Sequence, residues 1–444
     1  MAKAKTSKEI LAKFFDEGAY TTLFADADSA VTASFGSANG QPVYAICQNG
    51  AACTAKDAEK TVKTLKMASK TGNPVVTFYN STGAKLEEGL SALTASASVA
   101  ATVAKISGVV PQIAVVTGVC GASSALAAAA ADVCIVSKEG ELFLTAPFTS
   151  DAKGDKVANA GSAEFAAKAG VAHIVAENAE DAAAQAALLV GLLPANNLSV
   201  AGVFTFNAPV EAINTAKYCP VQAAKSIVDA GSEIELFAGC GKKVYTALAT
   251  VNGGVVGVVS TAENETLCKG CTAKTARFVR LCDAFSIPVI TIINTDGFTP
   301  SSTDDLTGGI REASRLAGTY ADATTAKIAV VTGKAVGPAY VALANADLTV
   351  AMQGCVIAPV APAVAVSVLH KEELDAGKNI AGDTAKLAAA YAKDVCSADA
   401  AVKAGLADFA AAPADVRGCV VAALDMLSTK RVQRLPKKHG NMSL

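Results

Sequence analysis

The second half of this chain repeats the first at a nearly constant offset, and this duplication limits the folds that the chain can adopt. Pro74–Asn80 reads PVVTFYN and Pro288–Asn294 reads PVITIIN, an offset of 214 residues (288 − 74). The hexapeptide IAVVTG occurs at Ile113–Gly118 and again at Ile328–Gly333, an offset of 215 residues (328 − 113). Two shorter pairs keep this register: Ala131-Asp132 with Ala346-Asp347, and Gly40 with Gly254. Such a repeat indicates two copies of one structural unit.

The sequence of each copy predicts an α/β unit in which parallel strands alternate with helices. The valine- and isoleucine-rich runs Val75–Phe78 and Ile328–Val331 are typical of buried parallel strands. Ala55–Ser69 and Thr272–Phe285 have the periodicity of helices. Small residues stand where we expect strands to end, at Ser81-Thr82-Gly83, Gly118, Gly297 and Gly333. Because ligands of α/β proteins bind at the carboxyl ends of strands, these positions are candidate ligand contacts.

The length of 444 residues suits two domains of about 200 residues each. The segment 207–232 contains Pro209 and Pro220 and has no counterpart in the other copy. We therefore predict an N-terminal domain over 1–206, a linker over 207–232 and a C-terminal domain over 233–444.

Composition excludes several classes of protein. A net charge of −2 without a basic stripe argues against a nucleic-acid partner. The polar start predicts no signal peptide, and the apolar run Cys355–Leu369 is short and carries Pro359 and Pro362, so we expect a soluble protein. Twelve cysteines without regular spacing indicate reduced thiols and hence a cytoplasmic location.

The sequence gives little support for a metal site or a catalytic histidine. His173, His370 and His439 have no partner at a catalytic or metal-binding spacing. Cys268 and Cys271 have the spacing of half a zinc site, but no second pair lies at the expected distance. We therefore predict no metal site and interpret these two cysteines as incidental thiols.

Two glycine-containing turns, one in each copy, are the best candidates for chemistry. Thr117–Ser124 reads TGVCGASS and Thr332–Tyr340 reads TGKAVGPAY, each between a predicted strand and a predicted helix. The first N–H groups of a helix have no partner within it and can hold a developing oxyanion. The alternative is that small residues only permit tight packing of strand against helix. Two turns at equivalent positions favour a functional role.

At these residues the chain resembles the biotin-dependent acyl-CoA carboxyltransferases. Val110–Ala114 with Gly118-Val119-Cys120 resembles the family's VPQIA…GPCAGGA turn, and Asn80–Gly89 resembles its DSGGARIQEG. Lys274–Pro288 is similar to KAARFIRLCDAFNIP. Gly297–Pro300 follows like the family's PGFxPG, and Pro436–Leu444 resembles the PxKHGNIPL ending of propionyl-CoA carboxylase β and methylmalonyl-CoA decarboxylase α subunits. The resemblance covers nearly the whole chain.

The resemblance implies a duplicated crotonase-like (ClpP/crotonase) fold, with a ββα superhelix in each half. It implies a carboxyltransferase that moves a carboxyl group between biotin and the α-carbon of a short acyl-CoA, such as propionyl-/methylmalonyl-CoA or acetyl-/malonyl-CoA. The coenzyme A thioester would lie on the N-half. Biotin, attached to a separate biotin carboxyl carrier protein, would lie on the C-half of another subunit and would itself take the α-proton.

The resemblance also implies a homo-oligomer, a hexamer built as a trimer of dimers. A biotin carboxylase would be a further partner in a carboxylase, and a membrane decarboxylase subunit in a decarboxylase.

By the same resemblance, the oxyanion donors are Ala122 and Ser123 in the N-half and Pro338 and Ala339 in the C-half. Proline has no N–H, which leaves Ala339, helped by Gly337, to hold the biotin oxygen. The implied substrate-binding residues are Gly83, Ala84, Gly118, Gly121, Gly297, Phe298, Gly337, Tyr340 and Val341. Val341 falls where the family tunes its acyl-group preference. The chain departs from the family at Asp296, Ser301 and Glu312–Arg315, all on the biotin side.

Two alternatives stay open. The departures on the biotin side are also expected of a catalytically degenerate subunit that acts as a scaffold in such a complex. A crotonase-type hydratase or isomerase would share the fold, but it would need a carboxylate beside the oxyanion turn, and the duplication within one chain argues against it.

Overall fold

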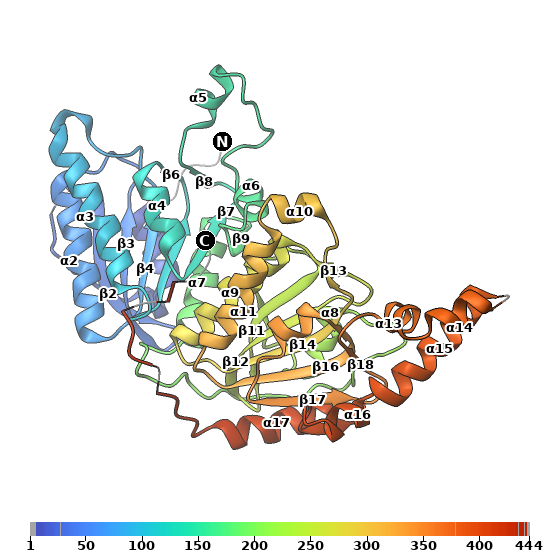
Figure 1. Ribbon diagram of the computed structural model, residues 1–444. Coiled ribbons are helices and arrows are strands. Elements are labelled where there is room, and N and C mark those ends of the chain that lie inside the picture. Colours follow the sequence, from blue (N-terminus) through green and yellow to red (C-terminus); the bar gives the residue numbers. More distant parts are fainter. Residues whose placement is uncertain (1–5, 27, 378, 434, 439, 442–444) are drawn as a thin grey trace. The chain divides into compact units, whose positions relative to one another are not determined.

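The computed structural model describes residues 6–26, 28–377, 379–433, 435–438 and 440–441, and the chain forms two compact units (Figure 1). The first unit runs to Gly202 and includes Phe237–Cys240. The second comprises Val203–Leu236 and the chain from Gly241 onward. The segment 207–232 contains the short helix α8 (Pro220–Lys225), which packs on strands of the second unit.

The first unit is built around a seven-stranded sheet with helices packed against it, and two further strands form a separate two-stranded sheet. Its strands are β1 (Tyr20–Leu23), β2 (Val31–Ala38), β3 (Gln41–Gln48), β4 (Val75–Tyr79), β5 (Gln112–Val116), β6 (Val119–Gly121), β7 (Val133–Ser137), β8 (Glu141–Phe143) and β9 (Ile174–Ala176). Its helices are α1 (Ser7–Phe14), α2 (Ala55–Thr71), α3 (Leu90–Ile106), α4 (Ser123–Ala130), α5 (Pro147–Ala152), α6 (Ala163–Lys168) and α7 (Ala179–Leu192). Two short 3₁₀ helices are η1 (Asp16–Gly18) and η2 (Leu86–Glu88).

The second unit repeats this plan around an eight-stranded sheet, again with a separate two-stranded sheet. Its strands are β10 (Ile234–Glu235), β11 (Val244–Val251), β12 (Gly254–Thr261), β13 (Thr266–Leu267), β14 (Val289–Thr295), β15 (Gly297–Phe298), β16 (Lys327–Val336), β17 (Leu348–Met352), β18 (Val356–Ala358) and β19 (Phe409–Ala411). Besides α8, its helices are α9 (Lys269–Ala284), α10 (Ser302–Leu306), α11 (Gly309–Asp322), α12 (Pro338–Leu343), α13 (Pro362–Leu369), α14 (Lys371–Ala376), α15 (Ile380–Val395), α16 (Ala398–Lys403) and α17 (Val416–Leu427).

The strand order is equivalent in the two units. It is β1-β2-β3-β4-β5-β7-β9 in the first and β10-β11-β12-β14-β16-β17-β19 in the second. In each, the first three strands are antiparallel and the rest are parallel. The predicted duplication is therefore confirmed at the level of topology. The parallel strands β4 and β5 are buried at every residue, as their valine-rich sequences predict.

One predicted strand end is wrong. We expected the strand at Ile328–Val331 to end at Gly333, but β16 continues to Val336 because Lys334–Val336 pair with β18. In the first unit the equivalent chain breaks after Val116 and resumes as β6, which pairs with β8. Both arrangements carry the chain past the main sheet to a turn and then into a helix.

Aspartate side chains accept backbone N–H groups at the amino-terminal edge of the parallel strands. The Oδ2 atom of Asp132 accepts the backbone N–H of Gln112 at 2.8 Å, and Asp347 accepts that of Lys327 at 2.8 Å. Asp408 does the same for Thr349, at 2.7 Å. Each aspartate directly precedes a strand, and its carboxylate accepts a backbone N–H of the neighbouring strand. The backbone N–H groups at this edge of the parallel strands are therefore bonded to side chains.

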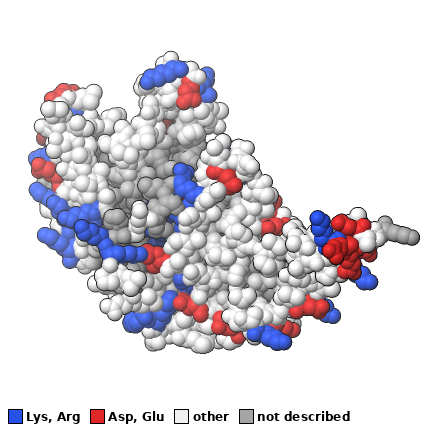
Figure 2. Space-filling model, in the orientation of Figure 1, with Lys and Arg blue, Asp and Glu red and all other residues white. Residues whose placement is uncertain are grey.

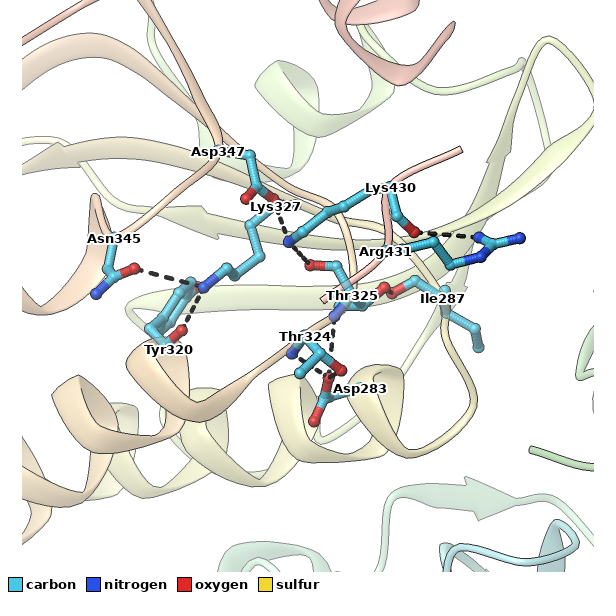
Figure 3. A network of polar contacts seen from close by, with 10 residues as sticks. All are labelled: Asp283, Ile287, Tyr320, Thr324, Thr325, Lys327, Asn345, Asp347, Lys430 and Arg431. Atoms are coloured by element: carbon cyan, nitrogen blue, oxygen red, sulfur yellow. Dashed lines mark hydrogen bonds and ion pairs between the residues drawn. The ribbon is translucent and has the colours of Figure 1, made fainter. Parts of the chain in front are cut away.

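The second unit adds lysines at this edge (Figure 3). Lys327 lies where the first unit has Gln112, and its ammonium group donates to the carbonyl of Tyr320 at the end of α11. Burial lowers the pKa of Lys327. Lys430 donates to Asp347 at 2.7 Å and to the carbonyl of Thr325 at 2.8 Å. These contacts fasten the chain beyond α17 to the second sheet, at the edge opposite to the glycine-containing turns.

Candidate active site

The turn of the first unit joins β6 to α4 through Ala122. This residue has φ 52° and ψ −121°, a conformation that an alanine rarely adopts. Its N–H donates to the carbonyl of Phe143 at 3.0 Å. The next two N–H groups, of Ser123 and Ser124, have no acceptor within the described part of the chain. Of the predicted donors Ala122 and Ser123, Ser123 is thus the one whose N–H is available to a ligand.

The turn of the second unit has the same backbone form. Gly337 has φ 58° and ψ −137°, and its N–H donates to the carbonyl of Ala358 at 2.9 Å. Gly337 is therefore the counterpart of Ala122, and Pro338 is the counterpart of Ser123. The two predicted donor pairs, Ala122 with Ser123 and Pro338 with Ala339, therefore do not occupy equivalent positions: the second pair begins one residue later in its turn than the first. Proline stands where the first unit offers its first available N–H.

A second segment of each unit approaches this turn from the end of the preceding strand. After β4, Gly83 has φ 110°, and after β14, Gly297 has φ 118°. The N–H of Gly83 donates to the hydroxyl of Ser81 at 3.1 Å, whereas that of Ala84 has no acceptor in the described residues. In the second unit, Phe298 occupies the position of Ala84 and pairs with β13.

In the first unit the two segments line one cavity of about 70 Å³. Gly83 and Ala84 from the one segment and Ser123 and Ser124 from the other all line it. The other lining residues come mainly from α2, α3 and the sheet: Val31, Ile46, Gln48, Cys53, Thr54, Asp57, Ala58, Thr61, Thr77, Tyr79, Ser81, Ala92, Ala95, Ser96, Val99 and Ala127. The structure thus brings the predicted residues Gly83 and Ala84 together with the predicted residue Ser123, which lies in a distant segment of the sequence.

Gly118 and Gly121 are required by packing. A Cβ atom on Gly118 would lie 2.1 Å from Oδ1 of Asn80, and one on Gly121 would lie 2.5 Å from the ring of Phe143. The counterpart of Gly118, Gly333, has the same relation to Asn294, at 2.3 Å. Neither Gly118 nor Gly121 lines the cavity, so they support the turn from behind.

The remaining predicted residues of the second unit lie on α12. The hydroxyl of Tyr340 donates to the carbonyl of Leu406 at 3.3 Å, and burial raises its pKa. The side chain of Val341 is 70% exposed. The N–H groups of Ala339 and Tyr340 have no acceptor among the described residues.

The single carboxylate that lines the cavity is committed to structural bonds. Asp57 accepts the hydroxyl of Ser29 at 2.5 Å, and it accepts the N–H and hydroxyl of Thr54 at 2.9 and 2.8 Å. Burial raises the pKa of Asp57, but these hydrogen bonds outweigh burial and lower it below 3.8. Thr54 and Asp57 form the capping box of α2. Asp57 is therefore poorly suited to act as a general base.

Ser124 and Cys53 line the cavity but are not among the residues predicted from the sequence. Cys53 contacts the hydroxyl of Ser81 at 3.4 Å, and burial raises the pKa of its thiol. The pattern Thr54-x-x-Asp57, which marks a helix start, could have placed Cys53 at the end of the loop before α2. Ser124 had no signal beyond its place in the turn.

A duplicated β/α unit whose strand–turn–helix segments expose backbone N–H groups defines a protein of the crotonase-like class. A model of the carboxyl transferase domain matches residues 8–442. This chain belongs to the carboxyl transferase family.

Individual relatives agree with this assignment. The methylmalonyl-CoA carboxyltransferase 12S subunit of Propionibacterium freudenreichii subsp. shermanii is 33% identical, over 96% of this chain and 88% of its own. The methylmalonyl-CoA decarboxylase subunit alpha of Veillonella parvula is 30% identical, over 99% of this chain and 93% of its own. A crystal structure of the transcarboxylase 12S hexamer with methylmalonyl-coenzyme A and methylmalonic acid bound has a TM-score of 0.93 and 30% identity, covering 99% of this chain and 92% of that one. The predicted duplicated crotonase-like fold is confirmed.

None of the described helices is both long enough and apolar enough to cross a membrane.

Proposed function

We propose that this protein is the carboxyltransferase of a biotin-dependent acyl-CoA carboxylase or decarboxylase. It would move a carboxyl group between biotin on a carrier protein and the α-carbon of a short acyl-CoA. The observation that carries this proposal is the pair of equivalent turns at Ala122 and Gly337, each followed by N–H groups without an acceptor in the described chain. Two turns suit a reaction in which two carbonyl oxygens gain negative charge.

In the first unit, the N–H groups of Ala84 and Ser123 would bind the thioester oxygen. Both residues line the same cavity, and donors fixed in place can stabilise an oxyanion without reorganisation. The cavity volume of about 70 Å³ admits only a few water-sized groups, which suits a short acyl chain.

A groove between α2 and α3 offers a path for the rest of coenzyme A. It measures about 870 Å³ and shares Ala58 and Ala95 with the inner cavity. Lys63, Lys66 and Lys105 line it, and Figure 2 shows basic side chains over this part of the surface. Ammonium groups would attract the phosphates of coenzyme A.

In the second unit, the N–H of Ala339 would hold the ureido oxygen of biotin, together with the strand segment at Phe298. Biotin, when bound, carries the carboxyl group and accepts the α-proton. The Ala339 N–H has no acceptor in the described chain, but the residue is fully buried, so biotin could reach this N–H only after the turn moves. Pro338 offers no donor, so this site has one N–H fewer than the first unit.

By analogy with the related transcarboxylase hexamer, we propose a homo-oligomer built as a trimer of dimers. The partners would be a biotin carboxyl carrier protein with either a biotin carboxylase or a membrane decarboxylase subunit.

The first test is carboxyl transfer from malonyl-CoA or methylmalonyl-CoA to free biotin, followed by chromatography of acetyl- or propionyl-CoA. Product that depends on biotin would support the proposal. Acyl-CoA binding by calorimetry without any product would contradict it and would favour the alternative of a scaffold subunit, which the absent Pro338 N–H motivates.

Two matched variants test the turns separately. The double variant A122G/S123P gives the first unit the Gly-Pro sequence of the second, and proline is well tolerated at the first position of a helix. We expect transfer to fall about 10²–10³-fold relative to A122G alone, because one donor is lost. P338G restores an N–H in the second unit and should raise transfer to biotin, by up to about 10²-fold. Unchanged rates in both would show that these N–H groups are not used.

A further inference from the structure

Cys268 and Cys271 lie in contact at the start of α9. Their sulfur atoms are 3.3 Å apart. Cys268 is the N-cap residue of the helix, and Cys271 is the third residue within it. Cys268 is partly exposed, whereas Cys271 is buried. The two thiols are therefore neighbours with different access to solvent.

The equivalent residues of the first unit show why these side chains meet. Thr54 and Asp57 stand 214 positions earlier, at the start of α2, and form a capping box with their side-chain oxygens 2.8 Å apart. A capping box directs the side chains of the N-cap and N3 residues toward each other. The second unit keeps this geometry but has a thiol at each position. Cys268 makes no side-chain cap to α9, so its sulfur is not engaged as the Thr54 hydroxyl is.

The surroundings leave room for a reagent beside Cys268. Lys269 and Gly270, between the two cysteines, are exposed, and beyond the chain neighbours and backbone of α9 a Cβ atom placed on Gly270 would meet only the Cys268 sulfur within 4 Å, at 3.8 Å. In the described residues, no group of three or more histidine, cysteine, aspartate or glutamate side chains could hold a metal ion. The pair is thus arranged as a dithiol that is open on the side of its first cysteine.

We propose that Cys268 and Cys271 form a redox-active dithiol that closes to an intramolecular disulfide by exchange with a small-molecule disulfide such as oxidised glutathione. The thiolate of Cys268 attacks one glutathione sulfur and releases the other glutathione as a thiol. The thiolate of Cys271 then attacks the Cys268 sulfur and releases the second glutathione. Two protein thiols are oxidised, one disulfide reagent is reduced to two thiols, and their two protons pass to these thiols.

The second step determines the pH dependence. Burial, and then the hydrogen bond with Cys268, raise the pKa of Cys271 to about 11. In the mixed disulfide the Cys268 thiol is gone, but burial still raises the pKa of Cys271, and because only the thiolate attacks, closure should accelerate as the pH rises.

The two cysteines can be followed on separate tryptic peptides. Trypsin cleaves after Lys269, between the two cysteines, and gives the peptides Val244–Lys269 and Gly270–Lys274 with one cysteine each. The full-length folded protein is incubated with oxidised glutathione, and free thiols are blocked with an alkylating agent at acidic pH. After digestion and mass spectrometry, we expect the two peptides joined by a disulfide.

Variants separate the two steps. C271S should trap glutathione on Cys268, because the resolving thiol is absent. C268S should leave Cys271 alkylated only after unfolding. Cys219 is exposed and provides an internal measure of reagent access, and C219S should leave the linked peptides unchanged. The proposal is overturned if wild-type protein keeps glutathione on Cys268, or if both peptides stay unmodified while Cys219 reacts.

Discussion

Replacing Ala122 with glycine should stabilise the first unit, although this substitution removes a methyl group and makes the unfolded chain more flexible. Ala122 is held at φ 52° and ψ −121°, where its counterpart is Gly337. A non-glycine residue in such a sparsely populated conformation costs about 1–3 kcal/mol. Glycine removes this strain but costs about 0.4–1 kcal/mol through the unfolded state. The net gain should be about 1 kcal/mol.

Thermal unfolding followed by circular dichroism measures this effect. For a unit of this size, 1 kcal/mol corresponds to about 2–4 °C in Tm, so A122G should melt higher by that amount. The matched control is A129G, which removes the same methyl group from an exposed position inside α4. Glycine inside a helix costs up to about 1 kcal/mol, and Ala129 is the second-last residue of α4, so this variant should melt slightly lower. The reverse change, G337A, should also melt lower, since its Cβ would lie 3.0 Å from the carbonyl oxygen of Pro359.

Opposite signs for A122G and A129G are the essential outcome. If A122G lowers Tm as much as A129G does, the backbone at Ala122 is not strained, and the equivalence of the two turns loses its energetic support. Carboxyl transfer by A122G should match the wild type, because the substitution leaves the backbone of the turn unchanged.

Three further predictions concern buried groups. G333A should destabilise the second unit by about 1–3 kcal/mol in urea unfolding, because the added methyl group collides with Asn294. D229A should cost about 3–5 kcal/mol in the same assay, since it leaves the partly buried Arg417 guanidinium, 2.8 Å from the buried carboxylate, without its counter-charge. The lowered pKa of Asp57 means that its contribution to stability is present above pH 3.8 and is lost as the pH falls through the folded-state pKa. D57N should thus be less stable than wild type at pH 7, with the difference shrinking in acid; a constant difference would contradict this account.

Much of the fold follows from local sequence. The run Val75–Phe78 predicts a strand because such side chains suit a position covered on both faces, and β4 is buried throughout. The helix at Ala55–Ser69 is found as α2, with Thr54 as its cap. The duplication could be read directly because each copy retains the residues that packing requires, such as Gly118 and Gly333 beside their asparagines.

The details of the site depend on contacts between distant segments. The N–H of Ala122 is taken by Phe143, which lies across a short strand pair that local sequence does not reveal. The strand at Ile328 passes Gly333 for the same reason, because β18 continues the ladder. The lack of a second cysteine pair argues against a zinc site at Cys268 and Cys271, but spacing alone does not show whether the two side chains meet. Their contact depends on the N-cap geometry of α9.

The aspartates at the amino-terminal edge of each sheet have a consequence for motion. The first amides of the parallel ladder, at Gln112, Lys327 and Thr349, are bonded to carboxylates and should exchange with deuterium only when the sheet itself opens. At the other edge, the amide of Ser123 has no acceptor in the described chain and belongs to a partly exposed residue, so it should exchange quickly. The first unit is thus slow to exchange at one end and fast at the other, so protection gained at Ser123 on adding a ligand would report binding directly.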